Sequence, residues 1–302
     1  MSVNGVHVAR RELVIGLSIL LVLAWGSTFP VINMALGNGF TPVPLAAARY
    51  GLAGLIILPA LLRAPRMSPS AWGGFALCGL TGIAAFNVFL NWGEMTVSGS
   101  AASLINASTP IMAALMGVFL GREKLTASGW LGSIVALCGV AVVCQASESV
   151  TLGWGALLVV GSAFSNAVFN VLQKPLAHRY GALLTMGWVI MAGAFFLLPW
   201  LPEALGELRA APWAGRAEVL WLALVPGLVG FACWAWLLKH VRLSQALLLL
   251  YAVPPAAIVE GVVLQGQWPG LETLVGGCIV LGGLALSRLD RPRPTPTLAP
   301  EP

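Results

Sequence analysis

Residues 13–36 read LVIGLSILLVLAWGSTFPVINMAL, an apolar run of 24 residues that contains no charged side chain. About 20 such residues carry a helix across a bilayer, so the run predicts a membrane span. Its second half nevertheless contains small, polar and helix-breaking residues, namely Gly26, Ser27, Thr28, Pro30 and Asn33. A helix that faced only lipid would have no use for them, so this span has protein or water on at least one side.

The composition of the whole chain agrees with a membrane protein. Of its 302 residues, 58% are hydrophobic and 9% are charged, and the mean hydropathy is +0.89. A soluble domain carries roughly 25% charged residues, so this chain could not cover its surface in water. The basic residues behind the net charge of +5 stand one or two at a time between apolar runs. They indicate membrane topology, and the lipid bilayer rather than nucleic acid is the expected partner.

Ten segments are long and apolar enough to cross the bilayer as helices, and only short connections join them, the longest being 202–216. The expected fold is therefore all-α, with a Pro-rich, disordered cytoplasmic tail at 289–302. The predicted spans are 13–36, 42–62, 71–92, 97–120, 126–145, 152–173, 182–201, 217–239, 243–264 and 271–288.

Positive charges orient these ten spans. With the N-terminus in the cytoplasm, thirteen Lys and Arg residues fall inside, and the outside connections keep only Arg209 and Arg216. The outside connections hold acidic residues instead, namely Glu94, Glu148, Glu203, Glu207, Glu218 and Glu272. Cytoplasmic connections of membrane proteins carry an excess of Lys and Arg, so both termini are predicted to be cytoplasmic.

The chain also contains an internal repeat. Shifting residues 92–141 by 144 positions places Trp, Pro and several Gly residues on identical ones, with no gap: Trp92 on Trp236, Pro110 on Pro254, Gly117 on Gly261, Gly132 on Gly276 and Gly139 on Gly283. The shift relates spans four and five to spans nine and ten. Five spans per half is an odd number, so the halves would be inverted in the membrane, as in many secondary transporters.

Three stretches resemble the EamA family of the drug/metabolite transporter superfamily. They read LAWGSTFPV in span one, AAARYGLAGLIIL in span two, and ASLINASTPIMAALMGVFLGREKLTASGWLGSIVALCGVAVV across spans four and five. In the second half, Gln267 stands where the LGREKLT turn of the first half has Glu123. The resemblance implies two inverted five-helix repeats, 13–145 and 152–288. It also implies a bacterial inner-membrane transporter that exports amino acids, other metabolites or drugs.

Prolines interrupt spans one, four and nine, and those of spans four and nine lie at equivalent places of the two halves. Pro30 removes a helix hydrogen bond in span one; either a tight helix contact or a central cavity would explain the small residues before it, and the cavity is favoured for Asn33. In span four, Asn106, Ser108 and Thr109 precede Pro110, and Pro254 marks the same place in span nine, three residues after Tyr251. Breaks at matching points of both halves predict a binding site near the midplane.

Two pairs of asparagines each share one helix face, Asn87 with Asn91 and Asn166 with Asn170. Such faces point toward other helices or toward substrate. Asn87 and Asn166 therefore join Asn33, Asn106, Ser108 and Tyr251 as candidate substrate ligands.

Arg49 and Glu260 are ionisable groups inside spans two and nine. A charge at the centre of a membrane helix costs about 2.5–3.5 kcal/mol, so a functional role is expected. Arg49 is suited to a substrate carboxylate, and Glu260 to gating or to coupling with a proton. A structural or gating Arg49–Glu260 ion pair is slightly favoured over direct contact with substrate.

The sequence thus predicts a secondary transporter that moves a small molecule by alternating access, with export favoured. A channel or a structural membrane protein is the alternative. The chain has no HExxH, no GxSxG, no Walker A motif and no Asp within the spans, so neither an enzyme nor ATP-driven transport is expected. No cofactor and no metal ion are expected either.

Overall fold

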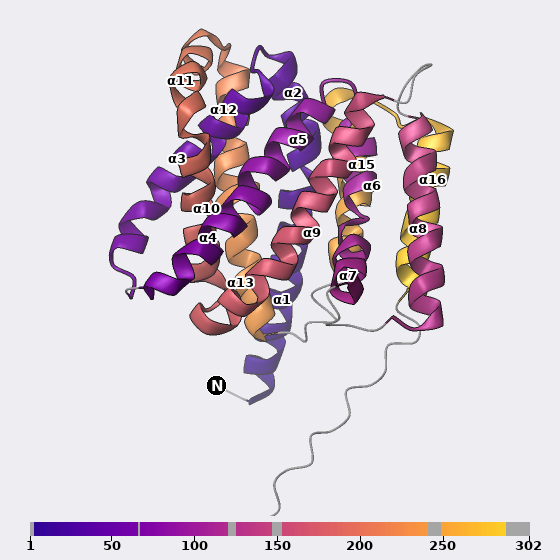
Figure 1. The fold of residues 1–302 in the computed structure, drawn as a ribbon, viewed down its shortest axis with the longest axis horizontal. Coiled ribbons are helices and arrows are strands. Elements are labelled where there is room, and N and C mark those ends of the chain that lie inside the picture. Colours follow the sequence, from indigo (N-terminus) through magenta and orange to yellow (C-terminus); the bar gives the residue numbers. More distant parts are fainter. Residues whose placement is uncertain (1–2, 66, 120–124, 147–152, 241–248, 288–302) are drawn as a thin grey trace, which may run out of the picture.

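The structure is a computed structural model that describes residues 3–65, 67–119, 125–146, 153–240 and 249–287. In these residues the chain forms helices joined by short connections and contains no strand, so the prediction of an all-helical fold is confirmed. The helices stand roughly side by side in one bundle (Figure 1). The chain enters α1 and leaves α16 at the same end, called the lower end here, and the opposite end is the upper end.

The helices of residues 3–146, the first half, are α1 (Val3–Gly26), α2 (Thr28–Gly37), α3 (Pro42–Leu62), α4 (Trp72–Gly79), α5 (Phe86–Gly93), α6 (Gly99–Asn106), α7 (Thr109–Phe119) and α8 (Ala127–Ala146). Those of residues 153–287, the second half, are α9 (Trp154–Tyr180), α10 (Ala182–Leu197), α11 (Leu201–Ala210), α12 (Trp213–Leu224), α13 (Gly230–His240), α15 (Val253–Gln265) and α16 (Leu271–Leu286).

Within the described residues, eight helical segments are long and apolar enough to cross a membrane. They coincide with the first eight predicted spans. The apolar helices at the ninth and tenth positions are shorter, Leu250–Gln265 and Leu271–Leu286. The start of the predicted ninth span, the last residue of the tenth span and the tail at 289–302 lie outside the described residues.

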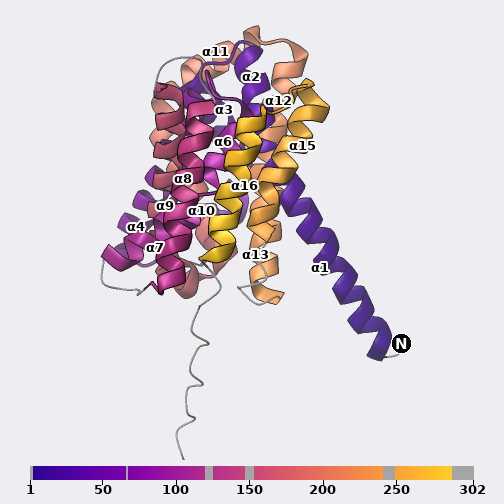
Figure 2. The same ribbon diagram turned by 90° about the vertical axis from the view of Figure 1, so that its right-hand side faces the viewer.

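The predicted connection at 202–216 is mostly helical in the structure. Helix α11 covers Leu201–Ala210 and has Pro202 in its first turn. Proline suits this position because the first turn has no hydrogen bond to lose, and the Ala, Leu and Glu residues that follow favour a helix. This helix lies at the upper end of the bundle (Figures 1 and 2).

The outside of the bundle is strongly apolar. Large hydrophobic side chains are exposed along most helices, including Leu55, Phe119, Phe195, Trp213, Val263 and Leu271. A soluble monomer rarely exposes so much contiguous apolar surface. The exposed surface therefore suits contact with lipid, and the polar side chains buried between the helices need their own explanation.

Helices α8 and α16 pack along each other at the edge of the bundle (Figure 1), and their glycines make this contact. A Cβ atom on Gly132 would lie 2.5 Å from Gly283 O, and one on Gly139 would lie 2.8 Å from Gly276 O. Conversely, a Cβ on Gly283 would lie 2.7 Å from Gly132 O, and one on Gly276 would lie 3.1 Å from Gly139 O. The two backbones therefore touch, as at small-residue helix contacts in membranes.

Two spans contain a stretch of π-helix. In the third span it covers Leu80–Ala85, between α4 and α5, and in the eighth it covers Val225–Val229, between α12 and α13. The two stretches begin 145 positions apart, close to the shift of 144 found in the sequence. Such π-helical turns within α-helices are frequent at functional sites.

Candidate functional site

A buried arginine lies between the two halves. Arg49 is two turns into α3 and 4% exposed. Its Nε donates a hydrogen bond to Leu222 O on α12 (3.1 Å), and its Nη1 donates to Asn87 Oδ1 on α5 (3.1 Å). Its guanidinium carbon lies 4.9 Å from the centre of the Tyr50 ring. The charge is therefore held by a carbonyl of the second half, an amide of the first half and an aromatic face.

Asn87 completes this cluster, called the Arg49 network (Arg49, Tyr50, Asn87 and Leu222 O). Its Nδ2 donates to Tyr50 Oη at 3.1 Å and to Ile83 O at 2.8 Å, and the side chain is fully buried. The structure thus brings together two predicted site residues from spans two and three. The π-helix of the third span ends immediately before α5, so it lies one turn from Asn87.

Polar contacts join the two halves at the upper end. Asn38 Nδ2 donates to both carboxylate oxygens of Glu218, at 2.8 and 3.0 Å. Thr41 donates from its hydroxyl to Glu207 Oε1 at 2.6 Å and from its backbone N–H to Oε2 at 3.1 Å. These upper-end contacts join the turn after α2 to α12 and α11.

The small residues of the opening stretch lie at helix contacts. Helix α1 ends at Gly26 and α2 begins at Thr28, two residues before Pro30. A Cβ on Gly26 would lie 2.9 Å from Glu260 Oε2, so only glycine lets α15 come this close. Ser27 Oγ accepts a hydrogen bond from Trp221 Nε1 of α12 (2.9 Å). The tight helix contact, one of the two interpretations of these residues, describes Gly26 and Ser27 in this structure.

Asn33 also bridges elements that are far apart in sequence. Its Nδ2 donates to the backbone carbonyl of Glu94 (3.1 Å), and its Oδ1 accepts from Gln265 Nε2 (3.4 Å). Gln265 Nε2 lies closer to the carbonyl of Pro30, at 2.7 Å. Gln265, at the end of α15, was not among the predicted site residues, yet it ties the broken first span to the ninth.

Replacing Gln265 with leucine should lower the free energy of unfolding by about 1 kcal/mol, the usual contribution of such a hydrogen bond. The matched control is Gln267→Leu, two residues on, because Gln267 is exposed. Thermal unfolding of the two purified variants checks the prediction. Equal melting temperatures would mean that the Gln265 bond contributes nothing.

Glu260 and Arg49 do not form an ion pair, and the interpretation of the two as partners was wrong. Both lie in described segments, and the Arg49 guanidinium donates to Leu222 O and to Asn87 Oδ1 instead. Glu260 instead lies against Gly26, and its Oε2 is buried with no hydrogen-bond partner among the described residues. The predicted ion pair is absent because the guanidinium donates its hydrogen bonds to a backbone carbonyl and a side-chain amide. These neutral acceptors cannot be recognised from charge patterns in a sequence.

The predicted break in span four is present as a gap between two helices. Helix α6 ends at Asn106, and α7 begins at Thr109, followed by Pro110. Asn106 Nδ2 donates to Ser162 Oγ of α9 (3.1 Å), and Thr109 Oγ1 donates to Ala163 O (3.4 Å). Ser108 is fully buried and donates to Ile105 O within its own turn. This break therefore faces α9.

The remaining predicted residues lie elsewhere. Asn170 Nδ2 donates to Asn166 O at 2.8 Å, and Asn170 is exposed, so this asparagine pair bonds to itself rather than to the Arg49 network. Tyr251 lies in the short 3₁₀ turn Leu250–Ala252 that leads into α15, and Pro254 lies in the first turn of α15. The structure thus forms separate polar clusters rather than one site.

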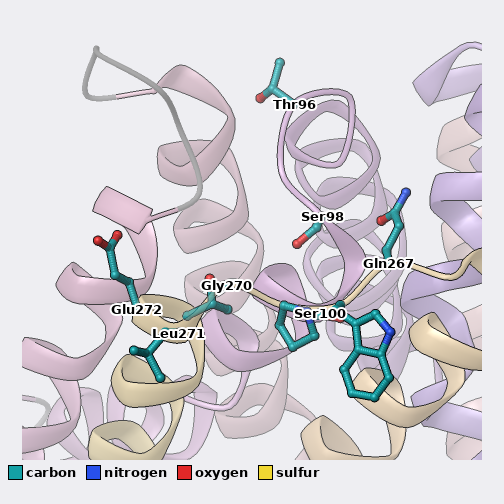
Figure 3. Close-up of a pocket in the computed structure, with 10 residues that line it drawn as sticks. Thr96, Ser98, Ser100, Gln267, Gly270, Leu271 and Glu272 are labelled. Carbon is teal, nitrogen blue, oxygen red and sulfur yellow. The ribbon is translucent and has the colours of Figure 1, made fainter.

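A pocket of about 700 Å³ lies at the upper end. It is lined by the segment before and at the start of α6, with Thr96, Ser98 and Ser100, and by residues 267–273 before and at the start of α16 (Figure 3). The predicted site residues are not among those that line it. Its hydroxyls and the Glu272 carboxylate make it a polar, solvent-facing recess.

Two glutamates that the sequence assigned to the outside connections are buried rather than solvated. Glu218 is 7% exposed in α12, where Asn38 binds its carboxylate, and Glu94 is 1% exposed at the C-terminal end of α5. Both stand at the end of an apolar run, where position along the chain does not separate a solvated charge from a buried one. The only feature of the sequence that could have indicated their burial is that each acidic residue lies directly at the boundary of a span.

Comparisons with known proteins agree with this architecture. The model of the EamA-like transporter family matches residues 13–145 and 153–289. A probable terminal-alkyne amino-acid exporter of Streptantibioticus cattleyicolor is 34% identical over 273 residues, which cover 89% of this chain and 91% of that one. A probable amino-acid metabolite efflux pump of Salmonella typhimurium is 25% identical over 285 residues, 90% of this chain and 93% of the pump.

An uncharacterized inner membrane transporter of Escherichia coli, YedA, is 26% identical over 273 residues, which make up 86% of this chain and 86% of YedA. One crystal structure shares the fold, with a TM-score of 0.60 and 19% identity over 92% of this chain and 98% of its own. The family model matches almost the whole chain, and the apolar surface and membrane-length helices fit a protein of the inner membrane. The chain therefore belongs to the EamA-like transporter family and is a multi-pass membrane transporter of small molecules.

Proposed function

We propose that this protein exports a small carboxylate-bearing metabolite of the amino-acid type by alternating access. The observation that carries the proposal is the Arg49 network, because Arg49 is held by Asn87 from the first half and by Leu222 O from the second. Separation of the halves at the upper end would break the Leu222 bond. The freed guanidinium is then suited to a carboxylate, which it binds through two parallel hydrogen bonds.

The proposed architecture has ten membrane spans in two inverted repeats, 13–145 and 152–288, with both termini in the cytoplasm. The two separate matches of the family model support this division. The glycine contact of α8 with α16 supports it as well. Under the shift of 144, Gly132 corresponds to Gly276 and Gly139 to Gly283, and the contacts Gly132–Gly283 and Gly139–Gly276 exchange under this correspondence. A two-fold axis requires such exchange.

In this proposed arrangement the upper end is the outer side, and the contacts of Asn38 with Glu218 and of Thr41 with Glu207 hold the halves together there. Asn33, Asn87, Asn106, Ser108, Asn166 and Tyr251 are the proposed cavity ligands beside Arg49, exposed in turn as the halves move. The breaks at Pro30, Pro110 and Pro254 are the proposed bending points, because irregular backbone is tolerated in a membrane only beside protein or a water-filled cavity. Glu260 is the proposed group for gating or proton coupling.

The identity of the substrate is tested by ligand-induced stabilisation. The probes are amino acids, nucleosides, sugars and cationic drugs, added to the purified wild type and to Arg49→Gln. A ligand at a hundred times its Kd stabilises the protein that binds it by about 2.7 kcal/mol. We expect a carboxylate compound to raise the melting temperature of the wild type and not that of the folded Arg49→Gln variant. Equal responses would remove Arg49 from the substrate site.

The same compound should then show saturable counterflow in vesicles that contain the protein. Relatives named as amino-acid exporters make amino acids the first choice of probe. Steady conduction without saturation would instead indicate a channel. Neither counterflow nor conduction with any probe would indicate a structural protein.

A further inference from the structure

Glu94 is a buried carboxyl group without a hydrogen-bond partner. It is 1% exposed, and neither Oε1 nor Oε2 has a partner in the described part of the chain. Two other carboxylates at the upper end differ from it, because Glu218 accepts two hydrogen bonds from Asn38 and Glu207 accepts two from Thr41. An ionised carboxylate that is buried without hydrogen bonds is strongly disfavoured and is neutralised instead.

A second unpartnered atom lies one turn earlier on the same helix. Asn91 donates through Nδ2 to Pro42 O (2.8 Å), which leaves its Oδ1 facing away from that bond, and this Oδ1 is buried without a donor among the described residues. Residues three apart on a helix are neighbours on its surface. Glu94 continues the helical hydrogen bonding, since its N–H donates to Leu90 O at 2.8 Å. The orphaned acceptor and the orphaned carboxyl therefore share one face.

One proton would satisfy both groups. A neutral carboxyl group has an O–H donor, whereas an ionised one only accepts. A proton on Glu94 would provide a donor on the face where Asn91 Oδ1 has none, and it would remove the cost of burying a charge. No cavity is needed for a proton, which suits a place where the side chain is almost completely enclosed.

The charges around Glu94 come from a single direction. Helices α2, α3 and α9 and the π-helical turn pack against α5. The facing parts of α2, α9 and the π-helical turn carry no Asp, Glu, Lys, Arg or His. Helix α3 supplies Tyr50, whose hydroxyl accepts a hydrogen bond from Asn87, and Arg49, which donates to Asn87 and to Leu222 O. Glu94 follows the last residue of its span, and burial raises its pKa well above the usual range although the Arg49 charge lowers it.

We propose that Glu94 is a proton-binding site of the closed upper end, protonated when the helices close over it and ionised when they open. The proton comes from the upper-side solvent, because the next residues, Met95 and Thr96, are exposed and Thr96 lines the upper-end pocket (Figure 3). The proton returns to the same side when the upper end opens. The pH on that side therefore determines the fraction of molecules that are closed, and no net proton crosses the membrane. The inference rests on the proposed function only for the opening of the upper end.

The dependence on pH follows from linkage. A carboxyl whose pKa is raised in the closed, folded form binds more protons there than in the open or unfolded form. The proton therefore stabilises the closed form fully at a pH below the ordinary pKa range of Glu. This stabilisation is lost as the pH rises through the raised pKa of the closed form. Over that window the equilibrium should shift by up to about tenfold per pH unit for the one proton.

Infrared difference spectroscopy tests the site without any transport assay. Spectra of the purified full chain, recorded in steps from acid to alkaline pH, report the C=O stretch of each protonated carboxyl. In the wild type we expect a band whose pKa lies above the usual range for Glu, and in Glu94→Gln we expect this band to be missing. The control is Glu218→Gln, which removes another buried carboxylate and should keep the band. Glutamine keeps the shape of Glu94 and donates an N–H to Asn91.

A band that persists unchanged in Glu94→Gln would overturn the proposal, as would a wild type with no such band. Asn91→Leu gives a second reading on a chain that keeps Glu94, because loss of the acceptor should shift the band. The melting temperature should fall with rising pH over the same window in the wild type and stay level in Glu94→Gln. A protonated Glu94 in a protein that transports nothing would contradict the proposed function and leave this site intact.

Discussion

Replacing Asn87 with alanine should lower the free energy of unfolding by about 2–3 kcal/mol, the cost of losing a buried hydrogen bond to a charged group. The substitution removes the acceptor of Arg49 Nη1 and the donor of Tyr50 Oη in one step. Arg49 is 4% exposed, so water cannot replace the lost bond. The measurement is unfolding of the purified variant in detergent, by heat or by a denaturing detergent.

The matched control is Asn170→Ala, an asparagine of a membrane helix whose side chain is exposed and bonds within its own turn. It should unfold like the wild type. Asn87→Asp restores an acceptor for Arg49 and should recover most of the lost stability. A stable Asn87→Ala would mean that the guanidinium is solvated by groups other than the Arg49 network.

Replacing Gly283 with leucine should cost about 3 kcal/mol, the upper part of the range for overpacked sites. A Cβ at this position lies 2.4 Å from Ala136 N and 2.7 Å from Gly132 O. Both neighbours are backbone atoms, so no side chain can rotate away, and α8 and α16 must separate. Thermal unfolding in detergent measures the loss.

Gly282→Leu is the control, one residue earlier on the same helix. Nothing lies within 4 Å of a Cβ at Gly282, and the residue is exposed on the apolar outside. This variant should keep the wild-type melting temperature. If both leucines destabilise equally, the cost comes from helix α16 itself and the close contact with α8 is not what glycine preserves.

Most of the fold could be predicted because it depends on local properties. Apolar length marks the spans, and eight of them reappear as membrane-length helices. The glycine register of spans five and ten depends on the same local pattern, and those glycines are the ones that touch. The helical connection α11 was missed because its polar residues were taken as a loop, although Ala, Leu and Glu there favour a helix.

The candidate site was only partly predictable, because its chemistry depends on neighbours that are distant in sequence. Arg49 and Asn87 each stood out as polar residues within spans, and the structure joins them. The carbonyl of Leu222 carries no signal in a sequence, so Arg49 was paired with Glu260 instead. Glu94 was missed for a related reason: its burial depends on helices from distant parts of the chain that pack against α5.

The contact of α8 with α16 has a consequence for ancestry. A surface that pairs with its own counterpart about a two-fold axis is what two identical five-helix chains would use to form a dimer. Joined in one polypeptide, the copies no longer depend on concentration to meet, and each is free to diverge. This chain carries Arg49 in α3, whereas α10, the corresponding span in the proposed inverted repeat, contains no charged residue. A homodimer of one such repeat would bear the buried charge twice, whereas two repeats in one chain can carry a single arginine.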